Sequence, residues 1–150
     1  HSTGGIIAGP GWGGDLTLLR WQLEVARYLA PDEAYNAAVL FLETDEELPP
    51  AVEVYRTLML MGERGLLQRF AAILVARPKA WSLDQRNSPA EKAAYMQEQA
   101  SVINRALDEY CPETLAVFNL DFGHTDPQVI LPSGGLIRID ASQRRIFVTY

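Results

Sequence analysis

Two uninterrupted apolar runs of strand length limit how this chain can fold more than any other feature. They read AAVLFLE at residues 37–43 and FAAILVA at residues 70–76. A strand with one solvated face alternates apolar and polar residues, whereas a continuous apolar run is typical of a strand covered on both faces. Segments with helical spacing lie before, between and after the two runs, so the sequence predicts strands that alternate with helices.

The remaining segments complete an α/β domain. We expect helices at about residues 16–29, 51–64 and 89–110. Asp15 is suited to cap the first helix, and Ser88-Pro89-Ala90-Glu91 is a capping-box sequence for the third. We expect further strands at residues 115–120, 128–131, 136–140 and 146–150, the last two joined as a hairpin at residues 141–144. The predicted fold class is therefore α/β, with a largely parallel core sheet flanked by helices and a β-rich C-terminal tail.

Size and charge exclude several classes of partner. The chain has 150 residues, enough for one domain with a proper core, and a formal net charge of −6. This balance argues against nucleic acid and anionic membranes as partners, and no apolar run approaches the roughly 18 residues of a membrane span. One cysteine, Cys111, excludes an internal disulfide and fits a cytoplasmic location. Residues 1–3 look like a cloning scar or an excision point, so we expect residues 4–150 to be one domain of a larger protein.

A glycine-rich stretch opens the chain. Residues 9–14 fit the G-x-G-x-x-G pattern of a dinucleotide-binding turn, and Glu43 at the end of the next strand would hold the ribose hydroxyls. Against this reading, Pro10 lacks an N–H, Asp15 places a carboxylate where a phosphate would bind, and Glu43 lies beyond the usual spacing of about 20 residues. We therefore favour a turn that lets the following helix pack closely, with nucleotide binding as an alternative.

Glu43 and His124 are the candidate catalytic residues. Both lie at the ends of strands that we expect to be buried, and functional residues of α/β folds gather at the ends of parallel strands. A buried carboxylate needs a partner, which for Glu43 is a backbone N–H, an arginine such as Arg56, or the imidazole N–H of His124. The last choice would make Glu43 the orienting acid of a triad. The chain offers no convincing nucleophile, because no serine lies in a Gly-x-Ser-x-Gly elbow.

Three further features of the sequence have structural as well as functional interpretations. His124 has no second histidine or cysteine cluster that would make it a metal ligand. Trp12 and Trp81 lie in Gly/Pro-rich loops near the expected site, where they would either form a substrate wall or simply pack. The acidic run at residues 45–47 reads as a solvated loop.

Several motifs, taken in order along the chain, carry a family resemblance. The sequence GWGGDL before a helix, then VLFLET, ERGLL, FAAILVARPKAW and DFGHTDPQVILPSGG, resembles the serine peptidases of the LD-carboxypeptidase and microcin C immunity family. The resemblance runs across nearly the whole chain but covers only the C-terminal half of such a protein. It implies a swivelling β/α-type C-terminal domain whose Glu43 and His124 complete a Ser–Glu–His triad. The serine would lie on an absent N-terminal domain, and Asp15 falls where the family usually has Asn.

The resemblance also implies a reaction. His124 would take the proton of the serine and return it to the leaving amine, while Glu43 fixes the imidazole. The substrate would be an L–D peptide bond of a murein tetrapeptide, with release of D-alanine, or the amide of an aminoacyl sulfamoyl or phosphoramidate nucleotide. No metal or organic cofactor is implied. We expect the chain to be inactive without its N-terminal domain and to self-associate as a homodimer through the exposed docking face. A nucleotide-binding module and a non-catalytic interaction domain are the alternatives.

Overall fold

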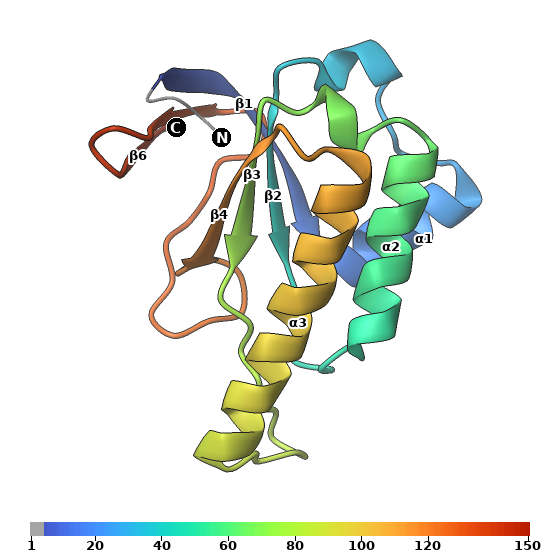
Figure 1. The fold of residues 1–150 in the computed structure, drawn as a ribbon, viewed down its shortest axis with the longest axis vertical. Helices are drawn as coiled ribbons and strands as arrows, with labels where there is room; N and C mark the ends of the chain where they lie inside the picture. Colours follow the sequence, from blue (N-terminus) through green and yellow to red (C-terminus); the bar gives the residue numbers. More distant parts are fainter. Residues whose placement is uncertain (1–4) are drawn as a thin grey trace.

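The computed structural model describes residues 5–150, so the expectation for residues 1–3 falls outside the described residues. The described chain forms one six-stranded sheet with helices packed on one face (Figure 1). The strands are β1 (Ile6–Asp15), β2 (Val39–Glu43), β3 (Ala72–Ala76), β4 (Leu115–Leu120), β5 (Leu136–Asp140) and β6 (Arg145–Thr149). The helices are α1 (Leu16–Val25), α2 (Ala51–Glu63) and α3 (Pro89–Tyr110), with short 3-10 helices at Asp32–Tyr35 and Leu67–Arg69.

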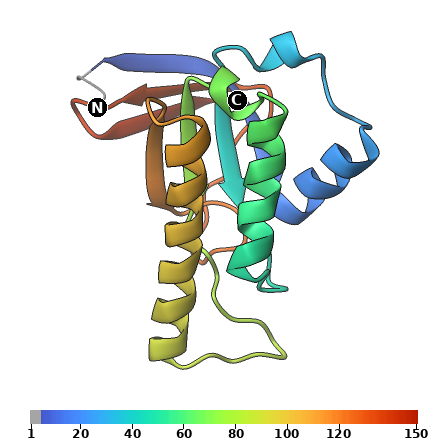
Figure 2. The same ribbon diagram turned by 45° about the vertical axis from the view of Figure 1, so that its right-hand side comes forward.

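The sheet combines a parallel core with an antiparallel tail, which confirms the predicted fold class. The strand order is β4-β3-β2-β1-β5-β6, and β1 to β4 pair in parallel. β1 joins the two parts because Ile6–Pro10 pairs antiparallel with β5 and Gly11–Asp15 pairs parallel with β2. In Figure 2 the first half of β1 runs with β5 and β6 across the direction of β2, so the sheet curls.

Burial on both faces of β2 explains the continuous apolar runs. Leu40 and Leu42 belong to the core cluster that includes residues of all three helices. Val39 and Phe41 point to the opposite face, in a second cluster with Phe122 and residues of β5. The alternation along the strand therefore separates two apolar environments rather than core from solvent.

The expected glycine turn is wrong, because residues 9–14 are extended strand within β1. Close approach of neighbouring segments explains the glycines at positions 9, 11 and 13. Gly13 has a φ of 143°, and a Cβ at this position would overlap the carbonyl oxygen of Phe41. Glycine therefore permits the tight pairing of β1 with β2 in a backbone conformation that L side chains rarely adopt. Asp15 caps α1 as expected, since its Oδ1 accepts from the Leu18 N–H at 2.9 Å.

Two other expectations differ from the structure. α1 ends at Val25 rather than near residue 29, because Ala26 adopts a left-handed conformation (φ 51°) and its N–H bonds back to the helix. Residues 128–131 form a loop rather than a strand. The Val129 N–H in this loop donates a hydrogen bond to the carbonyl oxygen of Asp121 at 2.6 Å. The hairpin of β5 and β6 and the capping box at Ser88 and Glu91 are confirmed.

Candidate active site

Polar side chains collect where the parallel strands end. β1 ends at Asp15 and β2 ends at Glu43, and the register pairs these two residues directly. Arg77 follows β3, and Asp121 follows β4. Because the strands are parallel, all four residues lie along one edge of the sheet, where α/β folds place their functional groups.

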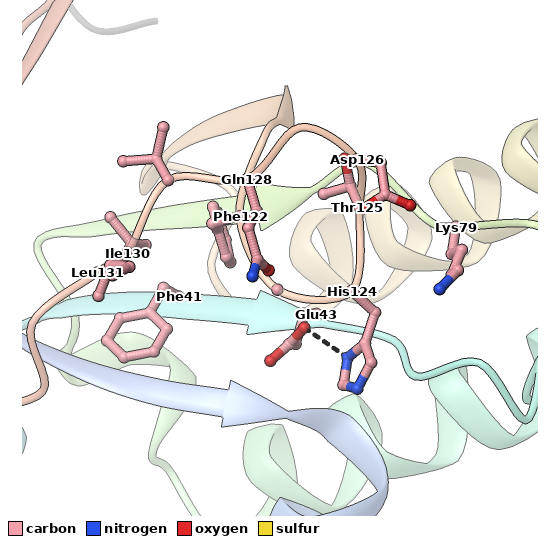
Figure 3. A pocket seen from close by; sticks show the side chains of 12 residues that line it. Phe41, Glu43, Lys79, Phe122, His124, Thr125, Asp126, Gln128, Ile130 and Leu131 are labelled. Atoms are coloured by element: carbon pink, nitrogen blue, oxygen red, sulfur yellow. Dashed lines mark hydrogen bonds and ion pairs between the residues drawn. The ribbon is translucent and has the colours of Figure 1, made fainter.

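Glu43 and His124 meet at this edge. His124 Nδ1 lies 3.0 Å from Glu43 Oε2, so the imidazole N–H donates to the carboxylate (Figure 3). The backbone before the histidine permits this contact, because Gly123 has a φ of 75° and a Cβ there would overlap Glu43 Oε2. Arg56, the other side-chain partner considered for Glu43, bonds to Glu53 at 2.6 Å instead.

The loop that carries His124 is anchored by Arg77. The guanidinium donates to Asp121 Oδ1 from Nε at 3.1 Å and from Nη2 at 2.7 Å, and Nη2 also donates to Thr125 Oγ1 at 2.7 Å. Thr125 is buried, and its hydroxyl donates to the carbonyl of Pro127 at 3.2 Å. Sequence reasoning missed Arg77 and Thr125. The available signal was the opposite charge of Arg77 and Asp121 directly after adjacent strands.

A second carboxylate contacts the other nitrogen of the imidazole. His124 Nε2 lies 3.0 Å from Glu46 Oε2, so the ring is held between two acids. Partial burial lowers the pKa of His124, but the hydrogen bond and charge of Glu43, together with the charges of Glu46 and Asp15, outweigh it and raise the pKa above its usual value. The His124 side chain is 39% exposed, whereas that of Glu43 is 17% exposed. The pair is therefore open to a group that approaches from outside.

An open cavity of about 540 Å³ lies beside the pair. Its apolar wall includes Phe41, Phe122 and the loop residues 129–131, and Lys79 supplies a cation (Figure 3). The size of the cavity, with an apolar wall and several polar and charged groups, suits a small-molecule or peptide substrate that carries both kinds of surface.

The structure does not bring the two candidate tryptophans into this cavity. Trp12 packs in an aromatic cluster, 4.7 Å from the ring of Tyr35 and 5.8 Å from that of Phe70. Trp81 lies under Lys79 Nζ, which is 4.8 Å from its ring centroid. Lys79 lines the cavity and Trp81 does not, so a contact of either tryptophan with substrate stays a prediction.

Residues 5–150 contain neither a metal-binding cluster nor a membrane-spanning helix. Within that range, no group of three or more His, Cys, Asp or Glu side chains is placed to hold a metal ion. No helix in the same range has the length and apolar character needed to cross a membrane.

Residues 8–139 match the sequence model of the LD-carboxypeptidase C-terminal domain. The chain belongs to this family. Among curated proteins, no match is found. This LD-carboxypeptidase C-terminal domain has the fold class and the family that its sequence indicated.

Solved structures of similar fold come from two kinds of protein. An MccF-like protein from Streptococcus pneumoniae in complex with AMP is 23% identical, with a TM-score of 0.71 over 97% of this chain and 41% of that chain. A muramoyltetrapeptide carboxypeptidase from Oxalobacter formigenes is 22% identical, with a TM-score of 0.69 over 96% of this chain and 44% of that chain. The microcin C7 self-immunity protein MccF, in complex with aspartyl sulfamoyl adenosine, is 19% identical, with a TM-score of 0.73 over 99% of this chain and 39% of that chain. The domain thus spans about two fifths of the length of these proteins.

Proposed function

We propose that this domain supplies the acid and base of a serine peptidase of the LD-carboxypeptidase type. The observation that supports the proposal is the hydrogen bond of 3.0 Å between His124 Nδ1 and Glu43 Oε2 at the edge where the parallel strands end. A carboxylate on Nδ1 fixes the tautomer in which Nε2 is free to accept a proton. His124 is then the general base, and Glu43 is the residue that orients it.

The nucleophile in this proposal is a serine on an N-terminal domain outside the chain. Its hydroxyl oxygen attacks the scissile carbonyl while the hydroxyl proton passes to His124 Nε2. The imidazolium, stabilised by Glu43, then protonates the leaving amine as the C–N bond breaks. Water, deprotonated by the same nitrogen, hydrolyses the acyl ester and returns the serine. Without that serine the chain is inactive, and no cofactor takes part.

Two substrates suit this chemistry. The first is the L–D peptide bond of a murein tetrapeptide, cut with release of D-alanine, and the similar fold of a muramoyltetrapeptide carboxypeptidase favours it. The second is the amide of an aminoacyl nucleotide conjugate, which is favoured by the similar folds that hold AMP or aspartyl sulfamoyl adenosine. Murein recycling in the cytoplasm is the setting that fits the first substrate.

The N-terminal domain docks, in this proposal, on the apolar wall of the large cavity. Val129 is 54% exposed and Ile130 is 73% exposed, although both are large apolar residues beside the catalytic pair. Apolar residues exposed together mark contact surfaces. Docking at this wall would bring a serine to the open side of His124.

The experiment that tests the proposal uses the full-length protein that carries this domain. We expect D-alanine release from a murein tetrapeptide, and loss of at least about 100-fold of the rate in His124→Gln and in Glu43→Gln. Asp108→Asn, at an exposed position of α3 away from the cavity, is the control and should keep most of the rate. Full activity in His124→Gln would refute the assignment of the base. Hydrolysis of an aminoacyl sulfamoyl nucleotide, with no D-alanine release, would select the second substrate.

A further inference from the structure

The short loop between β2 and α2 carries a group that touches the proposed base. It consists of residues 44–50, and we call it the β2–α2 loop. Glu46, in the middle of this loop, places its Oε2 3.0 Å from His124 Nε2. Glu43, the residue before the loop, contacts the other nitrogen of the ring. The position of the loop therefore decides whether a carboxylate covers Nε2, the nitrogen that has to exchange a proton with the serine.

Helix α3 holds the far end of the β2–α2 loop, which passes beside it (Figure 1). The carbonyl oxygen of Pro49 accepts two hydrogen bonds from this helix, from Gln99 Nε2 at 2.8 Å and from the Tyr95 hydroxyl at 3.1 Å. Tyr95 and Gln99 are four residues apart, so they lie on the same face of the helix. Two donors from one helix on a single carbonyl fix the loop backbone three residues after Glu46.

The backbone of the β2–α2 loop depends on such contacts. Leu48, which lies between Glu46 and Pro49, has a φ of 56°, in the left-handed region that residues with side chains rarely adopt. A strained conformation of this kind persists only where the surrounding structure fixes it. Within residues 5–150, the polar side-chain contacts that tie residues 45–50 to other elements are that of Glu46 with His124 and the two bonds on Pro49. The bonds from α3 are therefore the anchor that does not involve the base itself.

The amide of Gln99 supplies a donor that an apolar residue of its size could not. Gln99 is completely buried, and within residues 5–150 its Oε1 has no hydrogen-bond partner. Only the NH₂ end of an amide can donate to a carbonyl, so the bond to Pro49 leaves the amide oxygen in this unsatisfied position. A buried polar atom without a partner is unfavourable, and an apolar side chain would avoid that cost. What distinguishes Gln99 from a methionine at the same position is its bond to the loop.

We propose that Gln99, assisted by Tyr95, is a positioning residue for the reaction: its bond to Pro49 holds the β2–α2 loop so that Glu46 lies against His124 Nε2. Loss of this bond releases Glu46 from the ring. Glu43 stays in place, because it belongs to β2 and pairs with β1. This inference rests on the proposed function and deepens it, since it makes α3 the element that sets how far the base is covered.

The pKa of His124 reports the position of Glu46 without any need for turnover. The charge of Glu46 raises this pKa, so release of the loop should lower it. NMR titration of the imidazole in the full-length protein compares Gln99→Met with Glu46→Gln, and we expect Gln99→Met to give at least half of the shift of Glu46→Gln. Tyr95→Phe, which removes the second donor, should give a smaller shift in the same direction. The charged groups that line the two cavities beside the imidazole are Asp15, Glu43, Asp45, Glu46, Glu47, Lys79 and Asp126.

Ile103→Val is the matched control for loss of stability. Ile103 is buried on α3 one turn beyond Gln99, and its side chain has no polar group that could bond to the loop. The change weakens the packing of the same helix, and we expect it to lower Tm but to leave the pKa of His124 as it is. A purely structural role of Gln99 predicts the same result for Gln99→Met, so a lower Tm without a change of pKa would overturn the proposal.

A double variant shows whether the effect of Gln99 passes through Glu46. In the Glu46→Gln background we expect Gln99→Met to cause no further change in the pKa of His124. A further fall as large as in the unaltered background would mean that Gln99 acts by another route, and it would overturn the proposal. The expected shifts without any D-alanine release by the unaltered protein would refute the proposed function and leave the positioning role standing. D-alanine release with no shift in Gln99→Met or Tyr95→Phe would refute the positioning role alone.

Discussion

Substitution of Gly123 by alanine tests whether the backbone conformation before His124 positions the catalytic pair. Gly123 has a φ of 75°, in the left-handed region that costs an L residue about 1–2 kcal/mol. A Cβ at this position would also overlap Glu43 Oε2, the atom that accepts from His124. Gly123→Ala therefore adds backbone strain and forces the carboxylate away from the imidazole.

Gly65 offers a matched control for the strain alone. Its φ is 71°, and nothing lies within 4 Å of the position that its Cβ would take. Gly65→Ala should lower the free energy of unfolding only by the cost of a left-handed backbone at an L residue, about 1–2 kcal/mol. This corresponds to a fall in Tm of about 2–8 °C for a protein of this size. Its rate of D-alanine release should stay within about threefold of that of the unaltered protein.

The two variants should separate in activity more than in stability. In Gly123→Ala we expect a comparable or larger loss of Tm and a fall in kcat of at least about 100-fold, because the base loses the partner that orients it. The assays are thermal unfolding and D-alanine release by the full-length protein at a temperature where both variants are folded. Activity of Gly123→Ala equal to that of Gly65→Ala would refute the idea that Glu43 must touch His124.

Four more predictions address charge, anchoring and self-association. Glu46→Gln should lower the pKa of His124, because it removes a carboxylate that raises it, and NMR titration of the imidazole would show no shift if the contact is absent in solution. Because the pKa of His124 is raised in the folded state, protonation of His124 stabilises the fold fully below its unfolded-state pKa of about 6.5. This stabilisation is lost as the pH rises through the folded-state pKa. The Tm difference between the unaltered protein and His124→Gln should therefore shrink over that pH window. Thr125→Val removes the buried acceptor of Arg77 and should cost about 1–3 kcal/mol in chemical unfolding, with no loss refuting the anchoring role. The chain expressed without other domains should self-associate in sedimentation, and Ile130→Asp should leave it monomeric; a monomer in both cases would contradict an apolar docking surface.

The elements that could be predicted are those whose signals are local. The apolar runs at β2 and β3 and the capping box at Ser88 were sufficient to place a parallel core and the start of α3, because each signal depends on neighbours in sequence. The ten-residue strand β1 was misread because glycines in a strand and glycines in a turn look alike without the neighbouring chain. What requires glycine at position 13 is the backbone of Phe41, and this contact appears only when the sheet is assembled.

The same distinction between local and non-local signals applies to the residues of the candidate site. Glu43 and His124 could be proposed from the sequence because one ends β2 and the other lies in the turn after β4, and parallel strands that are adjacent or nearly adjacent end at one edge. The anchoring of the loop by Arg77 and the contact of Glu46 with Nε2 depend on side-chain directions in loops. No periodicity records those directions, so the structure was needed to find them.

The two contacts of His124 suggest an order of events at the site. Glu43 is the less exposed acid and holds Nδ1, while Glu46, whose side chain is 54% exposed, holds Nε2. A base in a finished triad presents Nε2 to its nucleophile, so the proposed mechanism requires Glu46 to leave before the serine can transfer its proton. An exposed side chain in a contact open to solvent moves at little cost, whereas the buried contact of Glu43 has to persist. The acid that fixes the base and the acid that covers it are thus distinguished by burial.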